Sequence, residues 1–221
     1  GDSLPFVELY LPEETFDQPC DQPAEGSPLS ISTVDSSTPR TGNKTATALT
    51  PDSCGAIAYF DESDNLLKFG IFTKGRWATE VVKDYDSVWN HLYDVSIAID
   101  SGGLPHIVSS GSLNLNSGQA HYYTKKGGEW TATEQYASTS GVGDAGIYAV
   151  GLEIDGIGDI YALAQKSYTS GWGTHSVIDA YRCTAVGHAN NSCTDRLDGG
   201  FDFDNNYIGR ISEASWSSSL D

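Results

Sequence analysis

Short runs of alternating apolar and polar residues, separated by turn residues, dominate the chain from Ala46 onward. Ala56–Phe60 ends at an acidic turn, Leu66–Thr73 follows it, and Lys74-Gly75 leads into Trp77–Val82. Runs of this kind, bounded by Gly, Asp and Asn, are typical of strands. No window keeps a helical period over about ten residues or more. With Ala46–Thr50, this stretch predicts four short strands joined by tight turns.

The same pattern returns further along the chain. Gly75-Arg76-Trp77 is echoed 53 residues later by Gly128-Glu129-Trp130, and Val95–Asp100 is echoed 55 residues later by Val150–Asp155. Self-similarity at about 50 residues indicates one supersecondary unit used several times. Four short antiparallel strands per unit are typical of a β-propeller blade, which is stable only beside copies of itself. We therefore predict an all-β fold of β-propeller blades, each a four-stranded antiparallel meander, with Trp77 and Trp130 packed between blades.

The expected units are residues 46–94, 95–149 and 150–216, and Ser217–Asp221 resembles the start of a fourth. Residues 1–45 are rich in Pro, Ser and Thr, so we expect an extended N-terminal arm. Because rings have about 4–8 blades, three units do not close a propeller. Remaining blades from the same or another chain are therefore expected partners; alternatively, the arm adds strands and a copy of the chain completes the ring.

The run Ser96–Val108 (SIAIDSGGLPHIV) resembles the blade-start repeat of secreted bacterial β-propellers. In that family, a strand ending in Asp meets a Gly-containing turn and a Pro-His strand, and Gly-Gly-Glu-Trp opens the outer strand. The resemblance extends from Ala46 to the C-terminus and is weakest in the third unit, where Asp159-Ile160-Tyr161 replaces Pro-His. It implies the propeller fold but no single activity, since such propellers include lectins, hydrolases and scaffolds.

Charge and hydropathy narrow the classes of partner. The 12 Lys and Arg against 30 Asp and Glu give a net charge of −18. An acidic surface repels phosphate backbones, so nucleic acid is not an expected partner. No stretch approaches the ~20 apolar residues of a membrane span, so we expect no membrane insertion.

The four cysteines indicate an oxidising compartment. Cys183 and Cys193 bracket a short polar loop, which leaves Cys20 to pair with Cys54. Four cysteines allow three pairings, so Cys20–Cys54 with Cys183–Cys193 is the favoured arrangement among them. Disulfides persist outside the reducing cytosol, and we expect a secreted, periplasmic or cell-surface protein.

Aromatic residues in loops and at strand ends are the candidate ligand-binding residues: Trp89, His91, Tyr93 and Trp172. Aromatic faces stack on sugar rings, and polar neighbours fix hydroxyl groups. The alternative is that such side chains pack between blades.

A calcium site is a second candidate. Asp202, Asp204 and Asn206 alternate as Ca²⁺ ligands do in D-x-D-x-[DN] loops, although Tyr207 stands where that pattern has Gly. An ordinary acidic loop is the alternative.

No catalytic residues can be assigned. The chain has no G-x-S-x-G motif, and its many carboxylates do not single out a pair. The first hypothesis is a secreted, non-catalytic propeller that binds or scaffolds a protein or glycan. The alternatives are a propeller glycoside hydrolase or lyase acting on extracellular polysaccharide, and a structural subunit of a cell-surface assembly whose arm reaches a neighbour.

Overall fold

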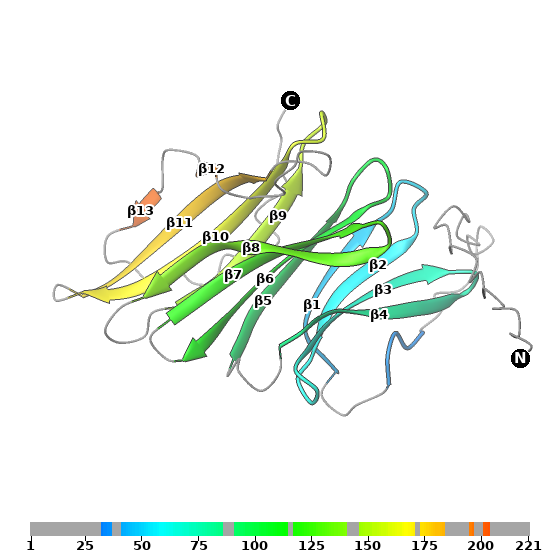
Figure 1. The fold of residues 1–221 in the computed structure, drawn as a ribbon, viewed down its shortest axis with the longest axis horizontal. Helices are drawn as coiled ribbons and strands as arrows, with labels where there is room; N and C mark the ends of the chain where they lie inside the picture. The colour runs from blue at the N-terminus through cyan, green and yellow to red at the C-terminus, as the bar shows by residue number, and fades with distance from the viewer. Residues whose placement is uncertain are drawn as a thin grey trace, which may run out of the picture.

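The computed structural model describes residues 32–36, 41–85, 91–114, 117–140, 146–170, 173–183, 195–196 and 201–203. Every regular element within these ranges is a strand, and the strands form three antiparallel sheets. Figure 1 shows the three sheets side by side, from the cyan first sheet through the green second to the yellow and orange third. The all-β fold of propeller blades that the sequence predicts is confirmed, and we call the sheets the first, second and third blade.

The first two blades are simple meanders in which each strand pairs with the next. The strands of the first blade are β1 (Thr41–Leu49), β2 (Gly55–Asp61), β3 (Leu66–Thr73) and β4 (Arg76–Asp84). Those of the second are β5 (His91–Ile99), β6 (Pro105–Asn114), β7 (Ser117–Lys126) and β8 (Glu129–Ser140). The first blade thus begins at Thr41, within the segment that the sequence assigned to the N-terminal arm, because Thr41 pairs with Asp61.

The third blade is less regular at its outer edge. It contains β9 (Gly146–Ile154), β10 (Ile160–Ser170) and β11 (Gly173–Cys183). Two short strands, β12 (Asp195–Arg196) and β13 (Phe201–Phe203), pair with different parts of β11 and share the fourth place. The predicted start of a fourth unit, Ser217–Asp221, lies outside the described residues.

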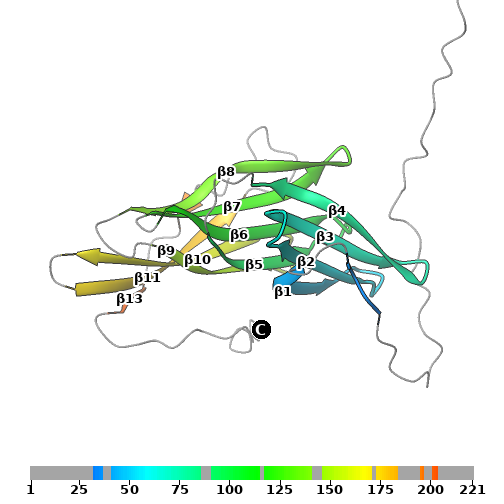
Figure 2. The ribbon, with the colours of Figure 1, turned by 90° about the horizontal axis from the view of Figure 1, so that it is seen from below.

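The blades stack through their inner strands and two hydrophobic cores. β1 packs beside β5, and β5 packs beside β9; Figure 2 shows the blades layered against one another. Phe69 and Tyr123 lie in the core between the first and second blades, and Val108 and Leu152 lie in the core between the second and third. Each meander buries apolar residues against its neighbour, which is the reason a single blade is not expected to be stable alone.

Equivalent turns mark the repeat in the structure. The Oδ1 atom of Asp100 accepts hydrogen bonds from the backbone N–H groups two and four residues later, at 2.9 and 2.8 Å. Asp155 does the same at 3.0 and 2.8 Å. Thr50 takes this place in the first blade, where its Oγ1 accepts a hydrogen bond from the N–H of Cys54 at 2.9 Å. The sequence repeat is therefore also a repeat of backbone geometry.

The two repeated tryptophans share a position but not all of their contacts. Trp130 packs edge-on against Phe69 of the first blade, with ring centroids 5.5 Å apart, so it is a blade-packing residue as predicted. Trp77 instead packs against Phe72 of its own blade, and its Nε1 donates a hydrogen bond to Ser32 at 3.0 Å. The prediction of blade packing is not met for Trp77, because a segment of the chain, and no preceding blade, lies beside it.

Among the residues that the structure describes, no helix has the length and apolarity needed to cross a membrane. Cys54 and Cys183 are disulfide-bonded. Cys20 and Cys193 lie outside the described residues, so the pairing Cys20–Cys54 and Cys183–Cys193 stays a prediction.

Candidate functional site

Two inner strands, β5 and β9, each have a tyrosine at a β-bulge. Tyr93 lies at a β-bulge of β5, since the residues on either side of it pair with consecutive residues of β6. Tyr148 lies at a β-bulge of β9, since the residues on either side of it pair with consecutive residues of β10. These positions are 55 residues apart, so they are equivalent in the repeat. A β-bulge redirects the side chain that it carries and is common next to active sites.

The two tyrosines meet at the edge of the molecule where β5 and β9 begin. Their ring centroids lie 4.9 Å apart with the planes inclined by 51°. The hydroxyl groups of Tyr93 and Ser112 form a hydrogen bond of 3.2 Å, and Ser112 is buried. Tyr148 is 40% exposed. The pair thus offers an aromatic surface that is open on one side and anchored on the other, which we call the tyrosine pair.

Neighbouring contacts fix the backbone beneath the tyrosine pair. The Oδ2 atom of Asp94 accepts a hydrogen bond from the N–H of Val150 at 2.9 Å and so joins β5 to β9. A Cβ atom on Gly118 would lie 2.4 Å from the backbone nitrogen of Ile147. Only glycine permits this close approach, because the opposing atoms are backbone and cannot rotate away.

The structure describes only part of the predicted aromatic site. Tyr93 lies at the site, as described above. His91 is the first residue of β5, but its side chain lies outside the described part of the chain. Trp89 and Trp172 also lie outside it. Their role in ligand binding stays a prediction.

Tyr148 was not among the predicted site residues, although a signal for it exists in the sequence. It follows Tyr93 by 55 residues, the spacing that also relates Val95 to Val150 and Asp100 to Asp155. Extending that echo two residues toward the N-terminus of β9 would have identified it. The bulges carry no comparable sequence signal.

The calcium prediction is not tested. Asp202 lies within β13, where its backbone pairs with Val177. Asp204 and Asn206 lie outside the described residues. Within the described ranges, no group of three or more His, Cys, Asp or Glu side chains is placed to hold a metal ion.

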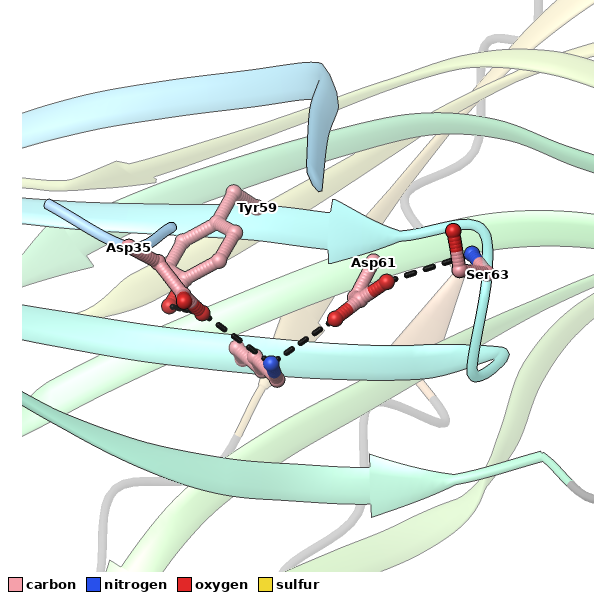
Figure 3. A network of polar contacts seen from close by, with 5 residues as sticks. Asp35, Tyr59, Asp61 and Ser63 are labelled. Atoms are coloured by element: carbon pink, nitrogen blue, oxygen red, sulfur yellow. Dashed lines mark hydrogen bonds and ion pairs between the residues drawn. The ribbon is translucent and has the colours of Figure 1, made fainter. Parts of the chain in front are cut away.

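One pair of carboxylates does converge, on the first blade (Figure 3). The ammonium group of Lys68 lies 2.8 Å from Asp61 and 3.0 Å from Asp35. Asp61 also accepts a hydrogen bond from the N–H of Ser63 at 3.1 Å, and Asp35 accepts one from the hydroxyl of Tyr59 at 2.9 Å. The side chains of Lys68 and Asp35 are 11% exposed and that of Asp61 is fully buried.

The two carboxylates favour the charged form of Lys68 and the neutral form of Tyr59. Burial alone would lower the pKa of Lys68, but hydrogen bonds and charges from Asp61 and Asp35 outweigh it and raise that pKa above its usual value. Burial, followed by the hydrogen bond and charge of Asp35, raises the pKa of Tyr59. Lys68 thus lies between two carboxylates and links Asp35, which precedes the first blade, to Asp61 at the end of β2.

Comparison with known proteins supports the fold alone. The chain matches no protein-family model and no curated protein sequence. Among solved structures, it resembles an α-L-arabinanase from Penicillium chrysogenum complexed with arabinobiose, with a TM-score of 0.51 and 13% identity over 79% of this chain and 52% of that one. An α-L-arabinofuranosidase from Fusarium graminearum has a TM-score of 0.47 and 12% identity over 74% and 48% of the two chains.

A fucose lectin from Kordia zhangzhouensis in complex with methyl-fucoside is also similar, with a TM-score of 0.41 and 12% identity over 74% of this chain and 99% of the lectin. The chain spans about half the length of the arabinanase and the arabinofuranosidase. The likeness to the arabinanase supports the assignment of the three sheets as blades of a β-propeller.

Proposed function

We propose that the chain is a non-catalytic β-propeller module that binds a glycan through the tyrosine pair. The observation that carries this proposal is the placement of Tyr93 and Tyr148 at equivalent bulges, with their rings 4.9 Å apart and Tyr148 exposed. A soluble protein gains no stability from exposing an aromatic ring, so a ring held open by backbone irregularity is better explained by a ligand.

The chemistry of the tyrosine pair suits a sugar ring. A tyrosine ring presents an apolar face to the C–H groups of a sugar, while its hydroxyl group donates or accepts hydrogen bonds. The two ring planes are inclined by 51°, so the pair presents an angled surface instead of a flat one.

The solved structures suggest which sugars to test first. The arabinanase was crystallised with arabinobiose, which is a property of that protein. We propose arabino-oligosaccharides as the first class of ligand for this chain. We propose a protein as the alternative ligand. We also propose that Asp202, Asp204 and Asn206 bind a calcium ion.

The two alternatives predict different observations. A glycoside hydrolase or lyase requires two carboxylates facing a substrate, whereas Asp35 and Asp61 are paired with Lys68 and buried. A surface assembly requires the N-terminal arm to reach another copy, whereas residues 32–36 contact their own blade. We propose a secreted, periplasmic or cell-surface location, with further blades from the same or another chain stacking beyond the third blade.

Calorimetric titration of the chain with arabino-oligosaccharides tests the proposal. Replacing Tyr148 by Ala should weaken binding about tenfold or more, since one stacked aromatic ring is worth more than about 1 kcal/mol at a binding site. Ile157→Ala is the matched control, because Ile157 is 85% exposed and lies in the turn beyond the far end of β9.

Equal affinity of wild type and Tyr148→Ala would overturn the assignment of the site. Release of shorter sugars during the titration, detected by chromatography, would replace the binding module with the hydrolase alternative.

A further inference from the structure

Each later blade turns the same face toward the blade before it. In the second blade this face carries Ile107 and Tyr123, which lie in the first core, and Trp130, which contacts Phe69. In the third blade it carries Ala162 and Tyr181, which lie in the second core. This packing face of each blade is therefore covered by its predecessor.

In the first blade, residues 32–36 cover the packing face instead. Ser32 accepts the hydrogen bond from Trp77 on β4, and Val34 lies 3.3 Å from the position of a Cβ atom on Gly70 of β3. Asp35 accepts hydrogen bonds from Tyr59 of β2 and Lys68 of β3, as Figure 3 shows. The segment thus crosses the face from the outer strand toward the inner ones.

The first blade is adapted in sequence to this segment. Ile57 pairs with Gly70 in the first blade, as Ile107 pairs with Tyr123 in the second and Ala162 with Tyr181 in the third. Two blades therefore carry tyrosine at a place where the first blade carries glycine. A side chain on Gly70 would meet Ile57 at 3.1 Å as well as Val34, so glycine leaves the room that Val34 fills.

Charged residues hold the segment in place. Asp35 and Lys68 form an ion pair of 3.0 Å in which both side chains are only 11% exposed. Removing Asp35 would leave the hydroxyl of Tyr59, itself 2% exposed, without this acceptor. Breaking a buried pair by deleting one partner is unfavourable, so the ion pair ties residues 32–36 to β2 and β3.

The opposite end of the stack presents the matching surface. Tyr161, Leu163 and Gln165 of the third blade are half-buried, whereas the equivalent His106, Val108 and Ser110 of the second blade are buried under the third. The outward face of the third blade is thus of the kind that docks on the packing face of a following blade. A second copy of the chain carries this face.

We propose that residues 32–36 are an end cap, which takes the place of a preceding blade and keeps the packing face of the first blade closed to the third blade of a second copy. Terminal repeats of stacked folds need such caps, since an uncovered face recruits another repeat. The cap directs any further blade to the β9–β11 side of the stack.

The experiment compares the full chain with Asp35→Ala, which removes the acceptor for Tyr59 and Lys68. Sedimentation velocity over a concentration series measures self-association, and hydrogen exchange measures the opening of residues 32–36. We expect faster exchange in the segment and dimerisation at least tenfold tighter than in wild type. Adding Leu163→Asp to the same chain should abolish the gain.

Asp64→Ala is the control, because it removes an exposed carboxylate in the turn between β2 and β3. Gly70→Tyr is a second variant, which installs the residue of the later blades and displaces Val34 while Asp35 stays intact; near-ultraviolet circular dichroism checks that each variant is folded. A folded variant whose segment opens but which stays monomeric overturns the proposal. Association that survives Leu163→Asp also overturns it. So does hydrogen exchange in residues 32–36 that neither Asp35→Ala nor Gly70→Tyr changes.

Discussion

Asp61 and Lys166 occupy the same position in the first and third blades, yet their side chains carry opposite charges. Asp61 lies two residues after Tyr59, which pairs across the strands with Lys68. Lys166 lies two residues after Ala164, which pairs with Asp179. Each forms an ion pair with that residue of the neighbouring strand. The pairs measure 2.8 Å between Asp61 and Lys68 and 2.6 Å between Lys166 and Asp179. The first and third blades thus both carry an ion pair at this place, with the polarity reversed.

Reversal of the pair in the third blade should therefore be tolerated. The single change Asp179→Lys places two ammonium groups together and should lower the free energy of unfolding by about 3 kcal/mol or more. The double change Lys166→Asp with Asp179→Lys should recover most of that loss. Chemical denaturation of both variants measures the difference, and a double variant no more stable than the single one would contradict the equivalence of the two blades.

The same reversal in the first blade should fail. A carboxylate at position 68 would face Asp35, which now lies 3.0 Å from the Lys68 ammonium. Asp61→Lys combined with Lys68→Asp should therefore stay destabilised by about 3 kcal/mol. Adding Asp35→Asn to this double variant should restore part of the stability, and denaturation curves in parallel with the third-blade variants provide the comparison.

Glycine at position 118 should be required for the site. Gly118→Ala brings a methyl group against the backbone of Ile147, so the start of β9 must move and the free energy of unfolding should fall by about 2 kcal/mol or more. Gly151→Ala is the matched control in β9, because its methyl group would meet only the side chain of Leu163 at 3.4 Å. Thermal unfolding of both variants checks this, and equal losses would contradict the account.

His121 should make stability depend on pH. Burial, together with the charge of Lys83, lowers the pKa of His121 from 6.5 to about 4. The unfolded chain therefore binds the proton first, so this contribution to stability is present above pH 6.5 and is lost as the pH falls toward 4. The slope for one proton is at most about 1.4 kcal/mol per pH unit.

Denaturation at several pH values, in wild type and His121→Gln, isolates this contribution. The variant should lose less stability than wild type between pH 6.5 and 4. Parallel curves for the two proteins would show that His121 is no more sheltered when folded than when unfolded.

The repeated turn should depend on an oxygen at its first residue. Desolvation alone would raise the pKa of Asp155, but hydrogen bonds, first of all those from the backbone of Asp159 and Ile157, together outweigh it and lower that pKa below 3.8. Its stabilisation is thus present above pH 3.8 and is lost as the pH falls through the lower folded value. Asp155→Asn should keep both backbone hydrogen bonds at neutral pH and remove this loss in acid, whereas Asp155→Ala should weaken the turn at every pH.

The sequence predicted the blades well because their strands alternate and their turns repeat. Leu66–Thr73 was predicted with its observed ends as β3. The repeated run Val95–Asp100 begins four residues after β5 does, because the bulge at Tyr93 breaks the alternation on which the prediction rests. The start of β9 was missed in the same way, at the bulge of Tyr148.

The candidate site could be predicted only in part. Tyr93 was found as an aromatic residue near a strand end, and the repeat offered Tyr148, but the contact between them depends on the packing of β5 against β9. No feature of the neighbouring sequence indicates the role of Asp35, because a segment rich in Ser and Thr predicts only extended chain. Its partners Tyr59 and Lys68 are 24 and 33 residues away and meet it only in the folded protein.

Ring resonances of the tyrosines provide the most direct test of glycan binding at the tyrosine pair. In protein carrying ¹³C-labelled tyrosine, titration with an arabino-oligosaccharide should shift the signals of Tyr93 and Tyr148 together, with one dissociation constant. The signal of Tyr161, whose hydroxyl bonds to Asp155 in the turn beyond β9, should stay unchanged. Shifts confined to tyrosines other than Tyr93 and Tyr148 would contradict the account.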